Sequence, residues 1–122
     1  MKIAVDAMGG DFAPKEIVAG AILAAKRYDC EIVLVGDQTQ IQKELDKKYP
    51  EWRKSTISIH HASDVVGMGE HPGVAVRRKK DSSIVVATRL VKEGKCDAVL
   101  SAGNTGAAAA SALFILGRIK GI

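Results

Sequence analysis

Two short glycine-containing segments carry the residue types that could bind an anion. The first is DAMGGD at residues 6–11, and the second is SAGNTG at residues 101–106. Glycine lets backbone N–H groups approach a ligand closely because it has no side chain. Where such a segment leads into a helix, the unpaired N–H groups of the first turn also favour a negative charge. The second segment therefore suits a phosphate, with Asn104 and Thr105 as additional side-chain donors.

Neither segment has the spacing of a common nucleotide-binding motif. The Walker A and GxGxxG patterns are both absent, so nothing in the sequence favours ATP or NAD. The alternative explanation is geometric, because tight turns between a strand and a helix need glycine. Asp6 and Asp11 flank the first segment and could orient a ligand hydroxyl or a helix start. Helix capping is the structural explanation for Asp11.

The densest run of charge is RRKK at residues 77–80, followed by DSS at residues 81–83. Such a cluster could hold phosphate or dock an acidic protein. A solvated loop or helix start explains the same composition. Asp81 is expected to cap a helix, and cations just before a helix N-terminus are unfavourable against its dipole. Their position therefore favours a binding role for the cluster.

Histidines and cysteines are the remaining reactive side chains. His60, His61 and His71 could act as acid or base, but no carboxylate partner stands at a telling spacing, so surface or partly buried histidines are expected. An adjacent histidine pair rarely presents both rings to one metal ion. Cys30 and Cys96 match no metal motif and are expected to be free structural thiols. No metal or organic cofactor is expected.

The chain pattern predicts alternating strands and helices that position these residues. Strands are expected at residues 2–6, 31–35, 56–60 and 97–101, and helices at residues 14–28, 38–48, 82–93 and 105–116, with residues 62–73 irregular. This alternation predicts a Rossmann-like α/β fold, a parallel sheet with helices on both faces. Ligands bind such sheets at the carboxyl ends of the strands. Both glycine segments and the histidines fall at that edge, and the cysteines at the opposite one.

Length, composition and charge limit which class of protein this chain can belong to. The 122 residues suffice for one domain, and 47% apolar with 26% charged residues is typical of a globular protein. Aromatic residues make up only 4%, which argues against a stacking surface for nucleic acid. The net charge of +4 favours anionic partners. No signal peptide or membrane-spanning run is apparent, so a cytoplasmic protein is expected.

Four motifs carry a family resemblance. They are VDAMGGDFAP at residues 5–14, HPGVAVRRKKDSS at 71–83, SAGNTGA at 101–107 and LFILGRIKGI at 113–122. In this order and spacing they resemble the bacterial phosphate acyltransferases of phospholipid synthesis, also called acyl-acyl-carrier-protein:phosphate acyltransferases. The resemblance covers essentially the whole chain. It implies a fold similar to those of isocitrate dehydrogenase and phosphotransacetylase.

The resemblance implies a reaction in which inorganic phosphate attacks the thioester of a fatty acyl chain on acyl carrier protein. The products are acyl phosphate and free carrier. It also implies a homodimer that associates peripherally with the inner face of the membrane, without a cofactor. No catalytic residue is assigned. The residues that motif position assigns to phosphate and acyl-phosphate binding are Gly9, Gly10, Asp11, Arg77, Arg78, Lys79, Lys80, Ser82, Ser83, Ser101, Gly103, Asn104, Thr105 and Gly106.

Departures from the family are local, except for length. Phe12, Gly69 and Gly73 stand where relatives have a polar residue, an acidic residue and alanine. The family is roughly two to three times longer, so the chain is expected to be an incomplete N-terminal domain, inactive alone, whose sheet ends on an unprotected edge. Two alternatives remain: a phosphotransacetylase-like enzyme that uses acyl-coenzyme A, and a non-catalytic phosphate-binding or interaction module. Nucleic-acid binding rests on the RRKK cluster alone and is not expected.

Overall fold

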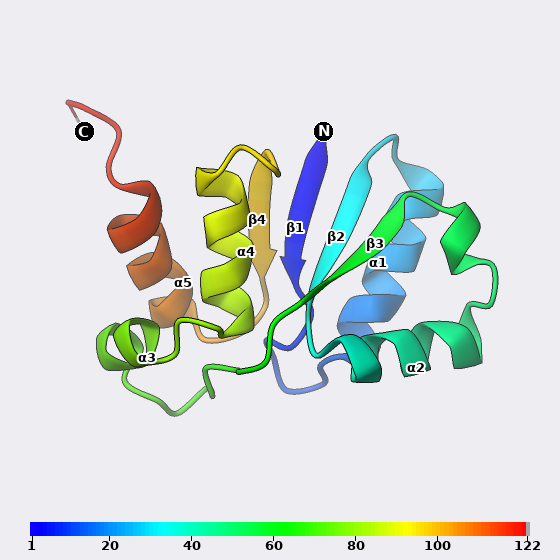
Figure 1. Cartoon of the computed structure of the whole chain (residues 1–122), viewed down its shortest axis with the longest axis horizontal. Helices are drawn as coiled ribbons and strands as arrows, with labels where there is room; N and C mark the ends of the chain where they lie inside the picture. Colours follow the sequence, from blue (N-terminus) through cyan, green and yellow to red (C-terminus); the bar gives the residue numbers. More distant parts are fainter. Residues whose placement is uncertain (122) are drawn as a thin grey trace.

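A parallel sheet of four strands lies between two layers of helices in the computed structural model, which describes residues 1–121 (Figure 1). The strands are β1 (Lys2–Asp6), β2 (Glu31–Gly36), β3 (Ile57–His61) and β4 (Ala98–Ser101). Their order across the sheet is β3-β2-β1-β4, and each neighbouring pair is parallel. The predicted α/β class is confirmed.

Each layer of helices covers one face of the sheet. The helices are α1 (Lys15–Arg27), α2 (Gln38–Lys48), α3 (Pro72–Arg78), α4 (Ser83–Lys92) and α5 (Thr105–Ser111), with short helical turns η1 (Trp52–Lys54) and η2 (Ala112–Leu116). In the sheet, Val5 and Leu34 pack with Ile22 of α1 and Ile41 of α2. On the opposite face, Ala4, Val33 and Val35 pack with Ala87 and Leu90 of α4. Because β1 and β2 are buried on both faces, their sequences read as continuous apolar runs.

The structure corrects the prediction in the second half of the chain. Residues 62–73 were expected to be irregular, but α3 begins at Pro72, after His71, whose Nδ1 accepts the Val74 N–H at 3.4 Å. Helix α4 begins one residue later than expected, with Ser82 rather than Asp81 at the N-cap, and Gly94 follows it at φ +75°. The last predicted helix is divided, because α5 ends at Ser111 and η2 continues as a wider π-helical turn.

The start of α1 also differs from the expectation. Lys15 is the first helical residue, and Pro14 holds the N-cap position without a side-chain cap. Asp11 is exposed in the preceding turn and makes no recorded side-chain hydrogen bond within residues 1–121. Capping therefore does not explain Asp11. Within the same residues, no helix combines the length and the apolar character that crossing a bilayer requires.

Candidate functional site at the carboxyl ends of β1 and β4

The two glycine segments meet backbone to backbone. The register of β1 and β4 pairs Asp6 with Ser101, so both segments leave the sheet side by side (Figure 1). A Cβ built on Gly9 would lie 2.9 Å from the Cα and N atoms of Gly103, and one on Gly103 would lie 2.8 Å from the Gly9 Cα. Side chains do not fit at such distances, so both positions require glycine.

Asp6 ties the two segments together. Its side chain is buried, with 4% of the residue exposed. The Ser101 hydroxyl donates to Asp6 Oδ2 at 2.8 Å, and the Met8 N–H donates to Asp6 Oδ1 at 3.1 Å. Gly103 N–H in turn donates to Ser101 Oγ at 3.1 Å. The sequence predicted that Asp6 could orient a ligand hydroxyl or a helix start. Its hydrogen bond to Ser101 was not predicted, because the link depends on the order of the strands in the sheet.

Backbone donors remain at this edge. Within residues 1–121, no hydrogen-bond acceptor is recorded for the N–H groups of Gly10, Thr105 and Gly106. Gly10 has φ +112°, a conformation that L side chains rarely adopt. Thr105 is exposed at the first turn of α5, where orphan N–H groups carry partial positive charge. These groups can receive oxygen atoms of an anion.

The side chain of Asn104 is committed to protein contacts. Its Oδ1 accepts the Ala107 N–H at 3.0 Å and so caps α5. Its Nδ2 donates to the carbonyl oxygens of Gly67, Met68 and Glu70 at 3.1, 3.3 and 3.1 Å. Asn104 therefore fixes the loop at residues 67–70 against the second glycine segment, and its predicted role as a phosphate donor stays a prediction.

Replacing Asn104 with alanine is expected to destabilise the fold by about 1–2 kcal/mol, because a helix cap is lost. It should also release residues 67–70, which would be seen as faster hydrogen exchange of the Glu70 amide. Asn104→Asp is the matched variant, because it keeps the capping oxygen and removes the amide donors. It should retain most of the stability and still release the loop. Unchanged exchange in both variants would contradict this role.

The basic segment occupies the last turn of α3 and the residues after it. Arg77 lies over the Phe114 ring at 5.4 Å from the ring centroid. The Lys79 ammonium donates to Glu70 Oε2 at 2.8 Å and to the Val65 carbonyl at 2.9 Å. The cluster was expected to precede a helix start, where its charges would be unfavourable. Arg77 and Arg78 end α3, where positive charge is favourable with the helix dipole, whereas Lys79 and Lys80 do precede the start of α4. The argument from unfavourable charges therefore applies to the two lysines and not to the two arginines.

Arg78 and Lys80 are the exposed basic residues that remain, since no salt bridge or side-chain hydrogen bond is recorded for either within the described part of the chain. Ser82 and Ser83, at the start of α4, are 0% and 1% exposed. Neither hydroxyl has a hydrogen-bond partner among residues 1–121. No recorded hydrogen bond joins any of these four residues to the glycine segments, so a shared phosphate site stays a prediction for them.

The Glu70–Lys79 pair predicts how stability depends on pH. The hydrogen bond from Lys79, aided by the Gly67 N–H, holds the pKa of Glu70 below its ordinary value of 4.5. Glu70 in turn raises the pKa of Lys79. A lowered carboxyl pKa contributes stability above its ordinary value, which is lost as the pH falls through the folded value. Stability should therefore fall less between about pH 6 and about pH 3 in Glu70→Gln than in the parent chain.

Urea unfolding at several pH values measures this effect. The raised Lys79 pKa does not alter that window, because its contribution is lost only on the alkaline side. Glu93→Gln is the control, because the Lys95–Glu93 pair is exposed and its side chains lie 3.1 Å apart. An equal acid dependence in Glu70→Gln and the parent would contradict the prediction.

Two of the three histidines accept backbone hydrogen bonds, and both cysteines are free. His61 Nδ1 accepts the Gln38 N–H at 3.1 Å, and His60 is exposed. Cys30 and Cys96 are free thiols, as expected, and burial raises the pKa of Cys96. Within residues 1–121, no group of three or more potential metal-ligating side chains is found.

Comparison with known proteins now decides the family. A family model described as "Fatty acid synthesis protein" matches residues 1–122. The chain belongs to the fatty acid synthesis protein family. It is 62% identical over all of its length to the "Phosphate acyltransferase" of Desulforamulus reducens, of which it covers 36%. It is 59% identical to the "Phosphate acyltransferase" of Pelotomaculum thermopropionicum, of which it covers 35%. The resemblance stated from the motifs is confirmed, and the chain spans about a third of the length of these curated relatives.

Proposed function

We propose that this chain supplies the anion-binding edge of a phosphate acyltransferase that makes acyl phosphate from inorganic phosphate and acyl-acyl carrier protein. The observation that carries the proposal is the contact between Gly9 and Gly103, which brings two sets of backbone donors together. The relatives' name, phosphate acyltransferase, supports the same reaction class.

The chemistry needs positioning and charge stabilisation more than a nucleophilic side chain. A phosphate oxygen attacks the thioester carbonyl and forms a C–O bond. The C–S bond then breaks, the carrier leaves as a thiolate that takes up a proton, and acyl phosphate remains. Backbone N–H groups can hold the phosphate and then the oxyanion of the tetrahedral intermediate.

The contacts within the site divide the roles of its residues. Ser101 donates its only hydroxyl hydrogen to Asp6, so it positions the second segment instead of donating to phosphate. The Asp6 carboxylate would also repel an anion placed next to it. The donors best suited to phosphate are therefore the unpaired N–H groups of Gly10, Thr105 and Gly106, none of which donates to that carboxylate.

Acyl carrier protein is acidic, and Arg78 and Lys80 are exposed charges that could steer it. The double variant Arg78→Ala, Lys80→Ala should raise KM for acyl-acyl carrier protein about three- to tenfold at low salt, with a smaller effect at high salt. Its rate with acyl-coenzyme A should be unchanged. Lys43→Ala, Lys47→Ala on α2 removes the same charge elsewhere and is the control. Equal effects of the two double variants would contradict a docking role.

Membrane association and dimerisation belong to the same proposal. Leu113, Phe114 and Ile119 are 50%, 53% and 74% exposed, and Arg118 and Lys120 flank Ile119. Exposed apolar side chains with cations next to them in the chain suit the surface of an anionic membrane. We propose cytoplasmic action at the inner membrane face, as a homodimer and without a metal or organic cofactor.

The deciding experiment measures thioester loss by a full-length protein in which these 122 residues replace the matched part of the Desulforamulus reducens relative. Loss of acyl-acyl carrier protein should require inorganic phosphate and yield acyl phosphate. Preference for acyl-coenzyme A would favour a phosphotransacetylase-like enzyme. Phosphate binding by calorimetry without turnover of either thioester would favour a non-catalytic module. Absence of both activity and binding would overturn the proposal.

A further inference from the structure

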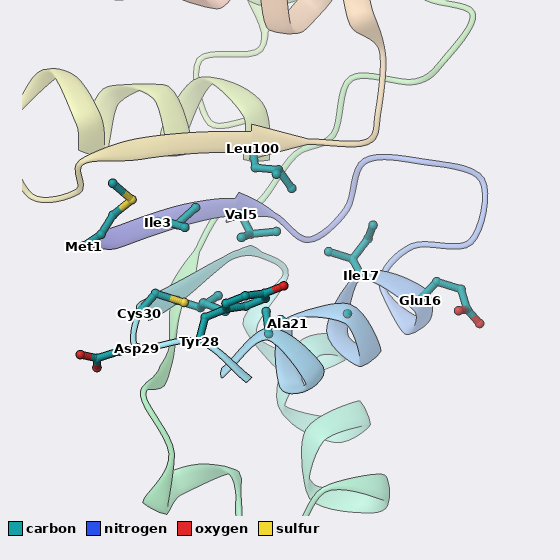
Figure 2. Close-up of a pocket in the computed structure, with 13 residues that line it drawn as sticks. Met1, Ile3, Val5, Glu16, Ile17, Ala21, Tyr28, Asp29, Cys30 and Leu100 are labelled. Carbon is teal, nitrogen blue, oxygen red and sulfur yellow. The ribbon is translucent and has the colours of Figure 1, made fainter. Parts of the chain in front are cut away.

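An apolar groove lies between β4 and α1, on the face of the sheet that α1 covers. Its volume is about 570 Å³. Figure 2 shows Ile3 and Val5 of β1 and Leu100 of β4 extending from the sheet toward this space, with Tyr28 and Ala21 opposite them. Tyr28 and Leu100 are 63% and 56% exposed, which is unusual for large apolar side chains grouped together.

The groove exists because one side of β4 is uncovered. Val99 packs against the clusters on the α4 face. Leu100, the next residue, points to the other face and stays exposed. Parallel strands are normally buried on both faces. Helix α5 follows β4 but packs against α3 and α4, so it does not cover Leu100.

The edge strand β3, on the opposite side of the sheet, exposes polar side chains where no helix covers it. Ser58 and His60 of β3 pair with Val33 and Val35, which face α4, and both are exposed there. These polar side chains can be solvated, so β3 needs no further cover. β4 instead exposes leucine, and within the described residues its only strand partner is β1. The apolar side of β4 is therefore suited to contact with more protein.

We propose that this groove seats an amphipathic helix from the part of the longer chains that has no counterpart in these residues. The match covers only 35–36% of the relatives, so about two thirds of such a protein remains to provide it. Helices α1 and α2 already form a layer over β1, β2 and β3, and this helix extends that layer over β4. Glu16 and Asp29 lie at opposite ends of the groove, with their carboxylates directed away from it (Figure 2). The groove itself is therefore apolar, and the face of the helix that enters it should be apolar as well.

Cys30 reports directly on occupancy, because its free thiol lines the groove. In the full-length chimera with the Desulforamulus reducens relative, maleimide labelling of Cys30 should be at least about tenfold slower than in the 122-residue chain. Cys96, which is 5% exposed outside the groove, is the internal control and should label slowly in both. Rapid labelling of Cys30 in the chimera would overturn the proposal by itself, whatever the behaviour of the shorter chain.

A pair of variants in the chimera distinguishes the loss of helix binding at the groove from a general loss of stability. Leu100→Asp places a charge under the helix and should restore rapid Cys30 labelling. Leu23→Asp alters an equally exposed leucine of α1 that does not line the groove, and labelling should stay slow. If Cys30 labels equally slowly in both variants, the helix is not seated on Leu100.

Two other occupants of the groove, a second copy of the chain and a fatty acyl chain, would give labelling results that differ from those expected for the helix. Protection of Cys30 in the chimera that is lost on dilution would assign the groove to a second copy. Protection by dodecanoate, with Cys30 still reactive in the ligand-free chimera, would assign it to a fatty acyl chain. Either result overturns the proposal. None of these measurements depends on catalysis, so they remain decisive if the proposed acyl transfer fails.

Discussion

Gly9→Ala is expected to lower the free energy of unfolding by about 1–3 kcal/mol, because the added methyl group has no room. The new Cβ would lie 2.6 Å from Asp6 Oδ2 and 2.9 Å from the Gly103 backbone. Backbone atoms on the Gly103 side must then move, which separates the two glycine segments. Urea unfolding measures the stability, and calorimetry with inorganic phosphate measures the anion site.

Gly20→Ala is the matched control for this substitution. Gly20 is exposed in α1, and a Cβ there would meet no atom within 4 Å. Alanine in a helix interior is favoured over glycine by roughly 0.5–1 kcal/mol, so this variant should be more stable than the parent. If Gly9→Ala is as stable as the parent and binds phosphate equally well, the contact between the segments does not form the site.

Asp6→Ala is expected to destabilise the chain by about 2–3 kcal/mol. It removes a charged acceptor and leaves the Ser101 hydroxyl and the Met8 N–H without their partner. Ser101→Ala should cost less, because it leaves the Met8 hydrogen bond intact. The double variant should show a coupling energy of about 1–2 kcal/mol between the two side chains.

Asp97→Ala provides the comparison. Asp97 also accepts a backbone N–H, from Lys2 at 2.8 Å, but it does so at the exposed amino edge of the same two strands. Its loss should cost under about 1 kcal/mol. A coupling near zero between Asp6 and Ser101, or equal effects of Asp6→Ala and Asp97→Ala, would show that Asp6 does not hold the segments together.

The architecture could be predicted from sequence where periodicity is strong. Apolar runs marked all four strands, and residues 38–48 matched α2 at both ends. Helix α3 was not predicted, because it has only seven residues and contains glycine, so its apolar residues show no helical period. The Pro72 that opens it, after a residue able to cap, was the usable signal.

The site was predictable at the level of which loops meet, and less so at the level of side-chain roles. Strand order had to be known before Asp6 and Ser101 could be paired. Asn104 was predicted to bind a ligand because the sequence does not show which acceptors its amide N–H groups have. In the structure, these donors bind the carbonyl oxygens of Gly67, Met68 and Glu70. Local pattern carries no information about such long-range partners.

The bond between Ser101 and Asp6 joins residues 95 positions apart in the chain. No folding intermediate in which β4 is undocked can contain this site, whatever the state of β1, β2 and β3. Contacts of such sequence separation are slow to form, because most of the chain must first be ordered. During synthesis, the first glycine segment therefore emerges long before its counterpart. The paired site can therefore form only after β4 has left the ribosome.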